Sequence, residues 1–333
     1  MLNTKEILKD LCEADFVGGV GSAVDTAENY LSKYCTVRRE GNNLIGEIKG
    51  KTDYTVLLDA HIDQIGMVVT LVKDGFLKVQ AAGGIDSRML AGMRVTIYGK
   101  RCVPGVFCST PPHLGKSDTV LKIEDMYIDT GLGEKANDII SVGDRVVFST
   151  NFSELAGNKV TARSLDNRAG CAALIKCAEI LFGKELPCNA VFLFSDAEEL
   201  GGMGAKTQSF EITPDVAVAV DVSFGNAPDI APDKTGVLGK GAMIGISPIL
   251  SNSVTNDLKA VANKNRIEYQ TEVMGGKTST NADKIVETKC GVPTGLVSIP
   301  LRNMHTPVEV IDVKDIDSVA EILAEFVLTR EVK

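Results

Sequence analysis

Apolar and polar residues follow two different patterns along this chain of 333 residues. Apolar residues at helical spacing predict helices that pack one face against a core, and short apolar runs bounded by polar residues predict buried strands. The predicted helices are 4–14, 24–34, 168–181, 252–264 and 313–329. The predicted strands are 43–49, 54–59, 189–194, 216–220 and 295–299. This alternation predicts an α/β fold with a mostly parallel or mixed sheet covered by helices.

The stretch from about residue 70 to residue 158 has a different pattern of apolar and polar residues. Its short β-like runs are separated by glycine and proline, and helical periodicity is nearly absent, which is typical of a small all-β unit. The runs are 76–79, 94–98, 105–108 and 144–148. We therefore expect a discontinuous α/β domain formed by residues 1–68 and 158–333, with a β-rich insertion at residues 69–157.

Composition and charge limit the binding partners and the cellular compartment that we expect for this chain. The net charge of −9 argues against nucleic acid or an anionic membrane surface as a partner. No stretch approaches the roughly 18 apolar residues of a membrane helix, and residues 1–16 lack the apolar core of a secretory signal. The eight cysteines are scattered without a C-x-x-C pair, which predicts small core residues in a reducing compartment. We therefore expect a cytoplasmic protein.

Polar residues with metal-binding side chains follow the predicted strands. His61 and Asp63 come directly after the strand at 54–59, and one residue of separation on an extended chain puts both on the same face. A carboxylate beside an imidazole can orient the ring at a metal. An ordinary core or surface pair explains this motif equally well.

Four further clusters repeat the pattern. Asp166 precedes the helix at 168–181, where a helix N-cap is the alternative reading. The strand at 189–194 leads into Asp196, Glu198 and Glu199, and three carboxylates after an apolar run are costly without a nearby cation, although a solvated helix start also explains them. The other two candidate residues are Asp221, which ends the strand at 216–220, and His305 in R-N-M-H-T-P.

Together these clusters supply two histidines, two aspartates and two glutamates. Mixed imidazole and carboxylate ligands suit zinc, cobalt or manganese rather than a thiolate site. The set exceeds the needs of one zinc ion. It fits a hydrolase in which a carboxylate bridges two ions about 3.5–4 Å apart.

The ordered motifs D-A-H-I-D, S-L-D-N-R-A-G, A-E-E-L-G and R-N-M-H-T-P-V-E resemble the M42 family of metallo-aminopeptidases, which includes glutamyl and tetrahedral aminopeptidases. The resemblance spans essentially the whole chain and includes G-V-F-C-S-T-P-P-H-L at residues 105–114. It implies a zinc-peptidase-like catalytic domain and assigns a role to each candidate residue. His61 and Asp221 would hold one metal ion, Glu199 and His305 the other, and Asp166 would bridge them. Glu198 would be the general base, and Asp63 would orient His61.

The resemblance also implies an activity and a state of assembly. The chain would release N-terminal residues from small peptides, using two divalent ions (zinc, cobalt or manganese) per subunit. The insertion would serve self-association into a homo-oligomer, with the family's twelve-subunit shells as the reference. The segment 275–283 is longer than the compact version typical of the family, which bears on substrate preference.

Three functions other than an aminopeptidase are alternatives for this chain. A metal-dependent deacylase or deacetylase on the same site is the main alternative. An endoglucanase-type glycoside hydrolase needs only two carboxylates, but the chain has no tryptophan and 5% aromatic residues, whereas sugar clefts favour aromatic platforms. A non-catalytic scaffold is disfavoured because all six key positions are intact.

Overall fold

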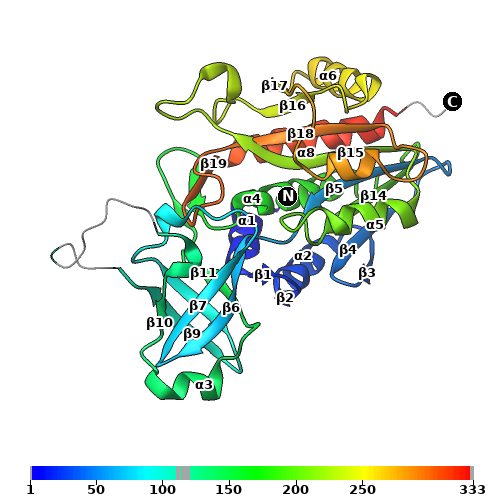
Figure 1. Ribbon diagram of the computed structural model, residues 1–333. Helices are drawn as coiled ribbons and strands as arrows, with labels where there is room; N and C mark the ends of the chain where they lie inside the picture. Colours follow the sequence, from blue (N-terminus) through cyan, green and yellow to red (C-terminus); the bar gives the residue numbers. More distant parts are fainter. Residues whose placement is uncertain (1, 110–112, 114–120, 331–333) are drawn as a thin grey trace.

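The computed structural model describes residues 2–109, 113 and 121–330. Residues 110–112 and 114 of the predicted motif at 105–114 lie outside these ranges. Figure 1 shows an α/β body with a β-rich unit below it. The helices are α1 (Thr4–Glu13), α2 (Ala23–Leu31), α3 (Ala136–Ile139), α4 (Leu165–Leu181), α5 (Met203–Ile212), α6 (Asn252–Asn265), α7 (Ala282–Val286) and α8 (Val313–Leu328).

A mixed sheet forms the centre of the body. Its strands, in spatial order, are β17 (Tyr269–Val273), β16 (Ala242–Ile246), β18 (Thr294–Leu301), β15 (Val216–Phe224), β5 (Thr55–His61), β14 (Asn189–Ser195), β4 (Asn43–Ile48) and β3 (Thr36–Glu40). The four inner strands β18, β15, β5 and β14 are parallel, so their carboxyl ends lie at one end of the sheet. The predicted mixed α/β fold is confirmed.

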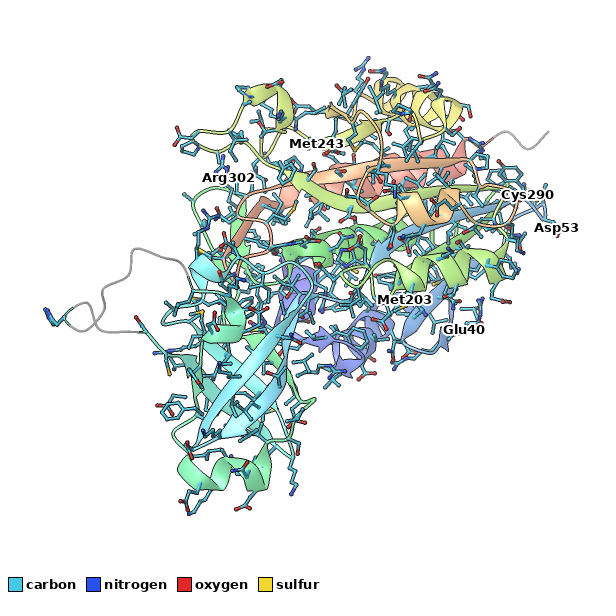
Figure 2. The ribbon with its side chains drawn as sticks, viewed as in Figure 1. Glu40, Asp53, Met203, Met243, Cys290 and Arg302 are labelled. Atoms are coloured by element: carbon cyan, nitrogen blue, oxygen red, sulfur yellow. The ribbon has the colours of Figure 1, made fainter. Side chains whose placement is uncertain are left out.

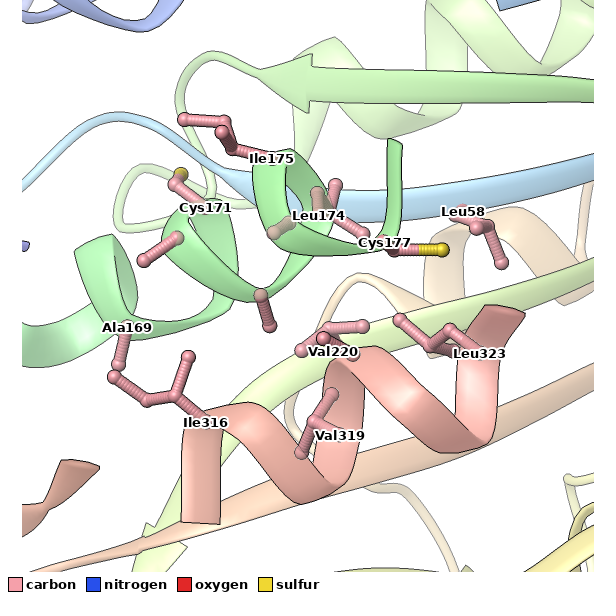
Figure 3. Packing of buried hydrophobic residues seen from close by; sticks show 14 of the residues in the cluster. Leu58, Ala169, Cys171, Leu174, Ile175, Cys177, Val220, Ile316, Val319 and Leu323 are labelled. Atoms are coloured by element: carbon pink, nitrogen blue, oxygen red, sulfur yellow. The ribbon is translucent and has the colours of Figure 1, made fainter. Parts of the chain in front are cut away.

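Helices cover both faces of the sheet, which explains the apolar runs of its inner strands. Leu58 belongs to the core under α4 and α8, while the adjacent Leu57 belongs to the core under α5 and α7. Figure 3 shows α4 and α8 packed side by side over the sheet, with Ile316, Val319 and Leu323 of α8 facing α4. The spacing of these three residues is the helical periodicity read from the sequence.

Six strands between Gly66 and Phe148 form a closed barrel with its own apolar core. The barrel strands are β10 (Ile128–Asp129), β7 (Phe76–Ala82), β6 (Gly66–Lys73), β11 (Arg145–Phe148), β8 (Arg94–Tyr98) and β9 (Cys102–Phe107). The first barrel strand, β6, crosses the predicted boundary between residues 68 and 69. A hydrogen bond of 2.6 Å from the Tyr98 hydroxyl to Asp15 ties the barrel to the α/β body.

Two smaller β units complete the fold. The strands of these units are β1 (Phe16–Val17), β2 (Val20–Gly21), β12 (Ser153–Glu154), β13 (Lys159–Ala162) and β19 (Glu309–Asp312). The strands β12, β13 and β19 form one antiparallel sheet, and β1 pairs with β2. None of the helices in the described part of the chain combines the length and apolar character that crossing a bilayer requires.

The carboxyl ends of the inner strands lie toward the barrel. Figure 2 labels Arg302, which follows β18, at the end of the sheet nearer the barrel, and Asp53, which precedes β5, at the opposite end. In α/β proteins, ligands bind beyond the carboxyl ends of the strands. The geometry therefore places the candidate site on the side of the α/β body that is nearer the barrel.

Candidate metal centre

The structure brings the predicted residues together at the carboxyl ends of the parallel strands. His61 is the last residue of β5, and Asp221 lies in β15. Glu198 and Glu199 follow β14, and His305 follows β18. These residues line one cavity of about 340 Å³.

Asp166 lies at the centre of the cluster, with one carboxylate oxygen toward each histidine. Its Oδ1 is 3.1 Å from His61 Nε2, and its Oδ2 is 3.4 Å from His305 Nε2. Asp221 Oδ1 lies 3.7 Å from His61 Nε2, and Glu199 Oε2 lies 3.7 Å from His305 Nε2. The cluster thus contains two groups of three donors, and Asp166 belongs to both.

These separations suit tetrahedral coordination of a divalent ion. Zinc bonds to nitrogen and oxygen of about 2.0–2.1 Å, at tetrahedral angles, put neighbouring ligand atoms about 3.3–3.5 Å apart. The observed distances of 3.1–3.7 Å lie around that value. Imidazole and carboxylate donors also match the preferences of zinc, cobalt and manganese. The residues therefore fit two ions that share Asp166.

Asp63 contacts both His61 and the two adjacent glutamates. Its Oδ1 lies 3.4 Å from His61 Nδ1, and its main-chain oxygen lies 3.2 Å from the same nitrogen. Its carboxylate also accepts the main-chain N–H groups of Glu198 at 3.0 Å and Glu199 at 3.2 Å. The side chain is therefore placed to orient His61, as the resemblance implies. The bonds to the two glutamates were not foreseen from the sequence.

The Glu198 carboxylate faces the cavity and makes no hydrogen bond to any residue that the structure describes. Burial, together with the neighbouring charges of Asp221 and Asp166, raises its pKa to about 7. A carboxyl group with a pKa near neutrality is suited to taking up and releasing a proton at physiological pH. This distinguishes Glu198 from Glu199, whose carboxylate belongs to a donor group.

The close packing of acidic and imidazole groups in the cluster shifts their pKa values. Burial and the charge of Asp166 raise the pKa of Glu199 to about 8. The hydrogen bond to Asp166 raises the pKa of His305 to about 9. Burial acts to raise the pKa of Asp166, but hydrogen bonds from His305 and His61 outweigh it, so this pKa lies below its usual value. Divalent ions that bind here would displace the protons of these groups.

The main chain at the start of α4 fixes the direction of Asp166. The residue has non-helical dihedral angles, and the Asp166–Asn167 peptide bond is cis. Asn167 donates to the Val220 carbonyl at 2.8 Å, and the buried Arg168 donates to the Ala14 carbonyl at 2.6 Å. The Asn167 side chain accepts the Gly170 main-chain N–H at 3.0 Å and so caps the regular part of α4, which means that Asp166 is not the N-cap considered from the sequence.

Glu309 supports two of the candidate ligands in a way that sequence analysis missed. Its buried carboxylate accepts the Asp166 N–H at 3.1 Å and the His305 N–H at 2.9 Å. Loss of a partner that orients a metal ligand typically lowers metal affinity about 10- to 100-fold. The only signal in the sequence was the final glutamate of R-N-M-H-T-P-V-E.

Two other supports come from segments distant in the sequence. Asn281 donates to Asp59 Oδ2 and to Ser195 Oγ, both at 2.9 Å, and so ties the divergent 275–283 segment to the strands beneath the site. Gly84, just after β7, lies against His305, where an added Cβ would be 2.7 Å from the ring nitrogen Nδ1. The barrel segment and the divergent segment both adjoin the metal centre.

The mixed sheet gathers histidines and carboxylates beyond its parallel strands, and such a donor set suits metal-assisted hydrolysis. The sequence model of the M42 glutamyl aminopeptidases matches residues 42–322, so the chain belongs to the M42 family. The chain is accordingly a hydrolase, and metal-dependent aminopeptidase activity is the function that the family supports.

Relatives of known name agree with this membership. The lysyl aminopeptidase of Pyrococcus furiosus is 31% identical over 291 residues, which cover 84% of this chain and 83% of the relative. The structure of aminopeptidase APDkam598 from Desulfurococcus kamchatkensis has a TM-score of 0.92 and 29% identity, covering 98% and 95% of the two chains. The Pyrococcus horikoshii TET1 peptidase, which can assemble into a tetrahedron or a large octahedral shell, has a TM-score of 0.87 and 29% identity, covering 98% of this chain and all of its own.

Proposed function

We propose that this chain removes N-terminal residues from peptides by means of two divalent ions that share Asp166. The position of the Asp166 carboxylate between His61 and His305 is the observation that carries the proposal. One ion would be held by His61, Asp166 and Asp221. The other would be held by Asp166, Glu199 and His305. Zinc, cobalt and manganese suit this donor set.

Divalent ions, when bound, polarise a carbonyl group and lower the pKa of water. The residues of the chain supply the proton transfers. Glu198 would take the proton of the attacking water and pass it to the amine that leaves, as its free carboxylate in the cavity allows. Asp63 would hold Glu198 in place through the main-chain bond of 3.0 Å and orient His61 from the other side. The cavity of about 340 Å³ lies within the size range of small-ligand sites.

A substrate panel tests this function against its main rival. The protein would be loaded with zinc, cobalt or manganese and assayed on aminoacyl-p-nitroanilides and on N-acetylated amino acids. An aminopeptidase cleaves substrates with a free α-amine and leaves the acetyl–amino acid bond intact. Release of acetate, with no p-nitroaniline formed, would instead identify a deacylase. Absence of both activities in metal-loaded protein would refute the proposal.

The barrel supports a proposal about assembly. We infer that the barrel, which the sequence predicts at residues 69–157 and whose first strand begins at Gly66, mediates self-association, and that the rest of residues 1–68 and 158–333 forms the catalytic domain. The barrel has a separate apolar core, and the related TET1 peptidase assembles into shells. Light scattering on the intact chain should show a homo-oligomer, for which a twelve-subunit shell is the reference. A strictly monomeric chain at micromolar concentration would contradict this role. The scattered free cysteines favour a cytoplasmic location for the assembly.

A further inference from the structure

Glu272 of β17 lines the cavity beside the metal centre, and the proposed reaction gives it no role. One of its carboxylate oxygens accepts a hydrogen bond from the Ser298 hydroxyl at 2.9 Å, and the other accepts from the Ser223 hydroxyl. Both partners are neutral. None of the described residues that line the cavity is a lysine or an arginine. The carboxylate therefore lines the cavity with two neutral hydroxyl partners and no lysine or arginine beside it in the cavity wall.

The sheet register places Glu272 next to the metal centre without making it a ligand. Ser298 on β18 is the register partner of the candidate ligand Asp221 on β15. Gly245 on β16 is the register partner of Glu272. A Cβ at Gly245 would lie 3.0 Å from the Cβ of Leu296, another residue of the cavity wall. Because Gly245 has no side chain, Glu272 can reach across β16 to Ser298. Glu272 belongs to neither group of donors.

The charges of the loaded site leave Glu272 unbalanced. Two divalent ions carry four positive charges, which the four carboxylates of the centre would balance. Those four are Asp166, Glu198, Glu199 and Asp221. Glu272 is then the fifth carboxyl group of the described cavity wall, and its burial raises its pKa. A half-buried carboxylate without a cation is costly, and a cationic group of the substrate would remove that cost.

We propose that Glu272 selects substrates whose N-terminal residue is lysine or arginine. The proposal rests on the aminopeptidase function proposed above and names the residue class that this site takes. Met274 and Leu296 line the same cavity and offer apolar surface for the aliphatic stem of such a side chain. An acidic side chain would meet the charge of Glu272 with no compensating cation. The site therefore disfavours N-terminal glutamate, although the family model carries the name of glutamyl aminopeptidases.

The test compares four substrates on three proteins. Lysyl-, arginyl-, leucyl- and glutamyl-p-nitroanilide would be assayed with the metal-loaded wild type, with Glu272→Gln and with the control Glu268→Gln. Glu268 is exposed, lies just before β17 and is absent from the cavity wall, so the control removes the same charge nearby. Metal content would be measured for each protein. Because Glu272→Gln removes the charge that a cationic side chain would bind, it should lower kcat/KM about 10- to 100-fold on the lysyl and arginyl substrates.

Each outcome decides the proposal. It is supported if the wild type prefers lysyl and arginyl substrates, if Glu272→Gln loses that preference while keeping its metal content and its leucyl activity, and if Glu268→Gln behaves as wild type. An equal loss on all four substrates would show that Glu272 acts on the common α-amine or on the metals, and would overturn the proposal. A wild-type preference for leucyl or glutamyl substrates would overturn it while leaving the aminopeptidase function intact. No activity on any substrate would overturn both.

Discussion

The most informative single change is Glu198→Gln, because Glu198 and Glu199 are neighbours with different proposed roles. The Glu198 side chain makes no hydrogen bond within the described structure, and its main-chain N–H is held by Asp63 at 3.0 Å. Glutamine preserves the shape of the side chain and leaves that main-chain bond in place. The substitution should therefore remove the proton acceptor and little else.

The expected loss follows from the role of a general base. Removing one typically lowers the rate about 10²–10⁴-fold, which corresponds to roughly 2.7–5.4 kcal/mol of transition-state stabilisation. The loss should fall on kcat with KM nearly unchanged, because the proton transfer belongs to the transition state. Glu198→Gln should still bind two metal ions. Glu199→Gln should bind fewer, because the Glu199 carboxylate is one of three donors in its group.

The assay needs kcat, KM and metal content for both variants on one aminoacyl-p-nitroanilide. Glu211→Gln, at an exposed position on α5, controls for the loss of one glutamate charge. If Glu198→Gln lost an ion while Glu199→Gln kept two and only slowed, the two roles would be reversed. Full activity in both variants would refute the reasoning about the site.

Two further predictions concern the supports of the metal centre and its protons. Gly84→Ala should displace His305 and lower metal affinity about 10- to 100-fold, as loss of an orienting contact typically does. Gly275→Ala, where an added Cβ meets nothing within 4 Å, should have no effect in the same chelator competition, and equal behaviour of the two variants would contradict the contact. Zinc binding to metal-free protein should release protons, because His305 with a pKa of about 9 and Glu199 with a pKa of about 8 are protonated at pH 7. Apparent affinity should then rise with pH from 6 to 8 in titration calorimetry, and a pH-independent affinity would be inconsistent with these shifts.

The sequence predicted those parts of the fold in which local pattern and burial agree. The inner strands β5, β14 and β15 are buried along nearly their whole length, so each reads as an apolar run that ends in polar residues. His61 and Asp221 could be located for that reason. Asp166 was ambiguous, because a single aspartate before a helix also serves as an N-cap, and only the tertiary structure shows its carboxylate between two histidines.

The rest of the site depends on contacts that no local pattern encodes. The edge strand β17 alternates between exposed and half-buried residues, so it has no apolar run and was not predicted. Glu272 was consequently overlooked. Gly84 and Glu309 reach the site through packing between distant segments, and neither a glycine just after a strand nor a glutamate at the start of one shows such a contact in its local pattern. The assignment of Glu198 as general base and of Glu199 as metal ligand stays a prediction.

The direct test of the shared-metal account is a titration of metal-free protein with zinc or cobalt. Activity on an aminoacyl-p-nitroanilide and bound metal per chain would be followed together, for the wild type and for Asp166→Ala. We predict no activity without metal, a plateau at two ions per chain, and fewer than two ions for Asp166→Ala, because both groups of donors include Asp166. A wild-type plateau at one ion, with Asp166→Ala binding the same amount, would contradict the account.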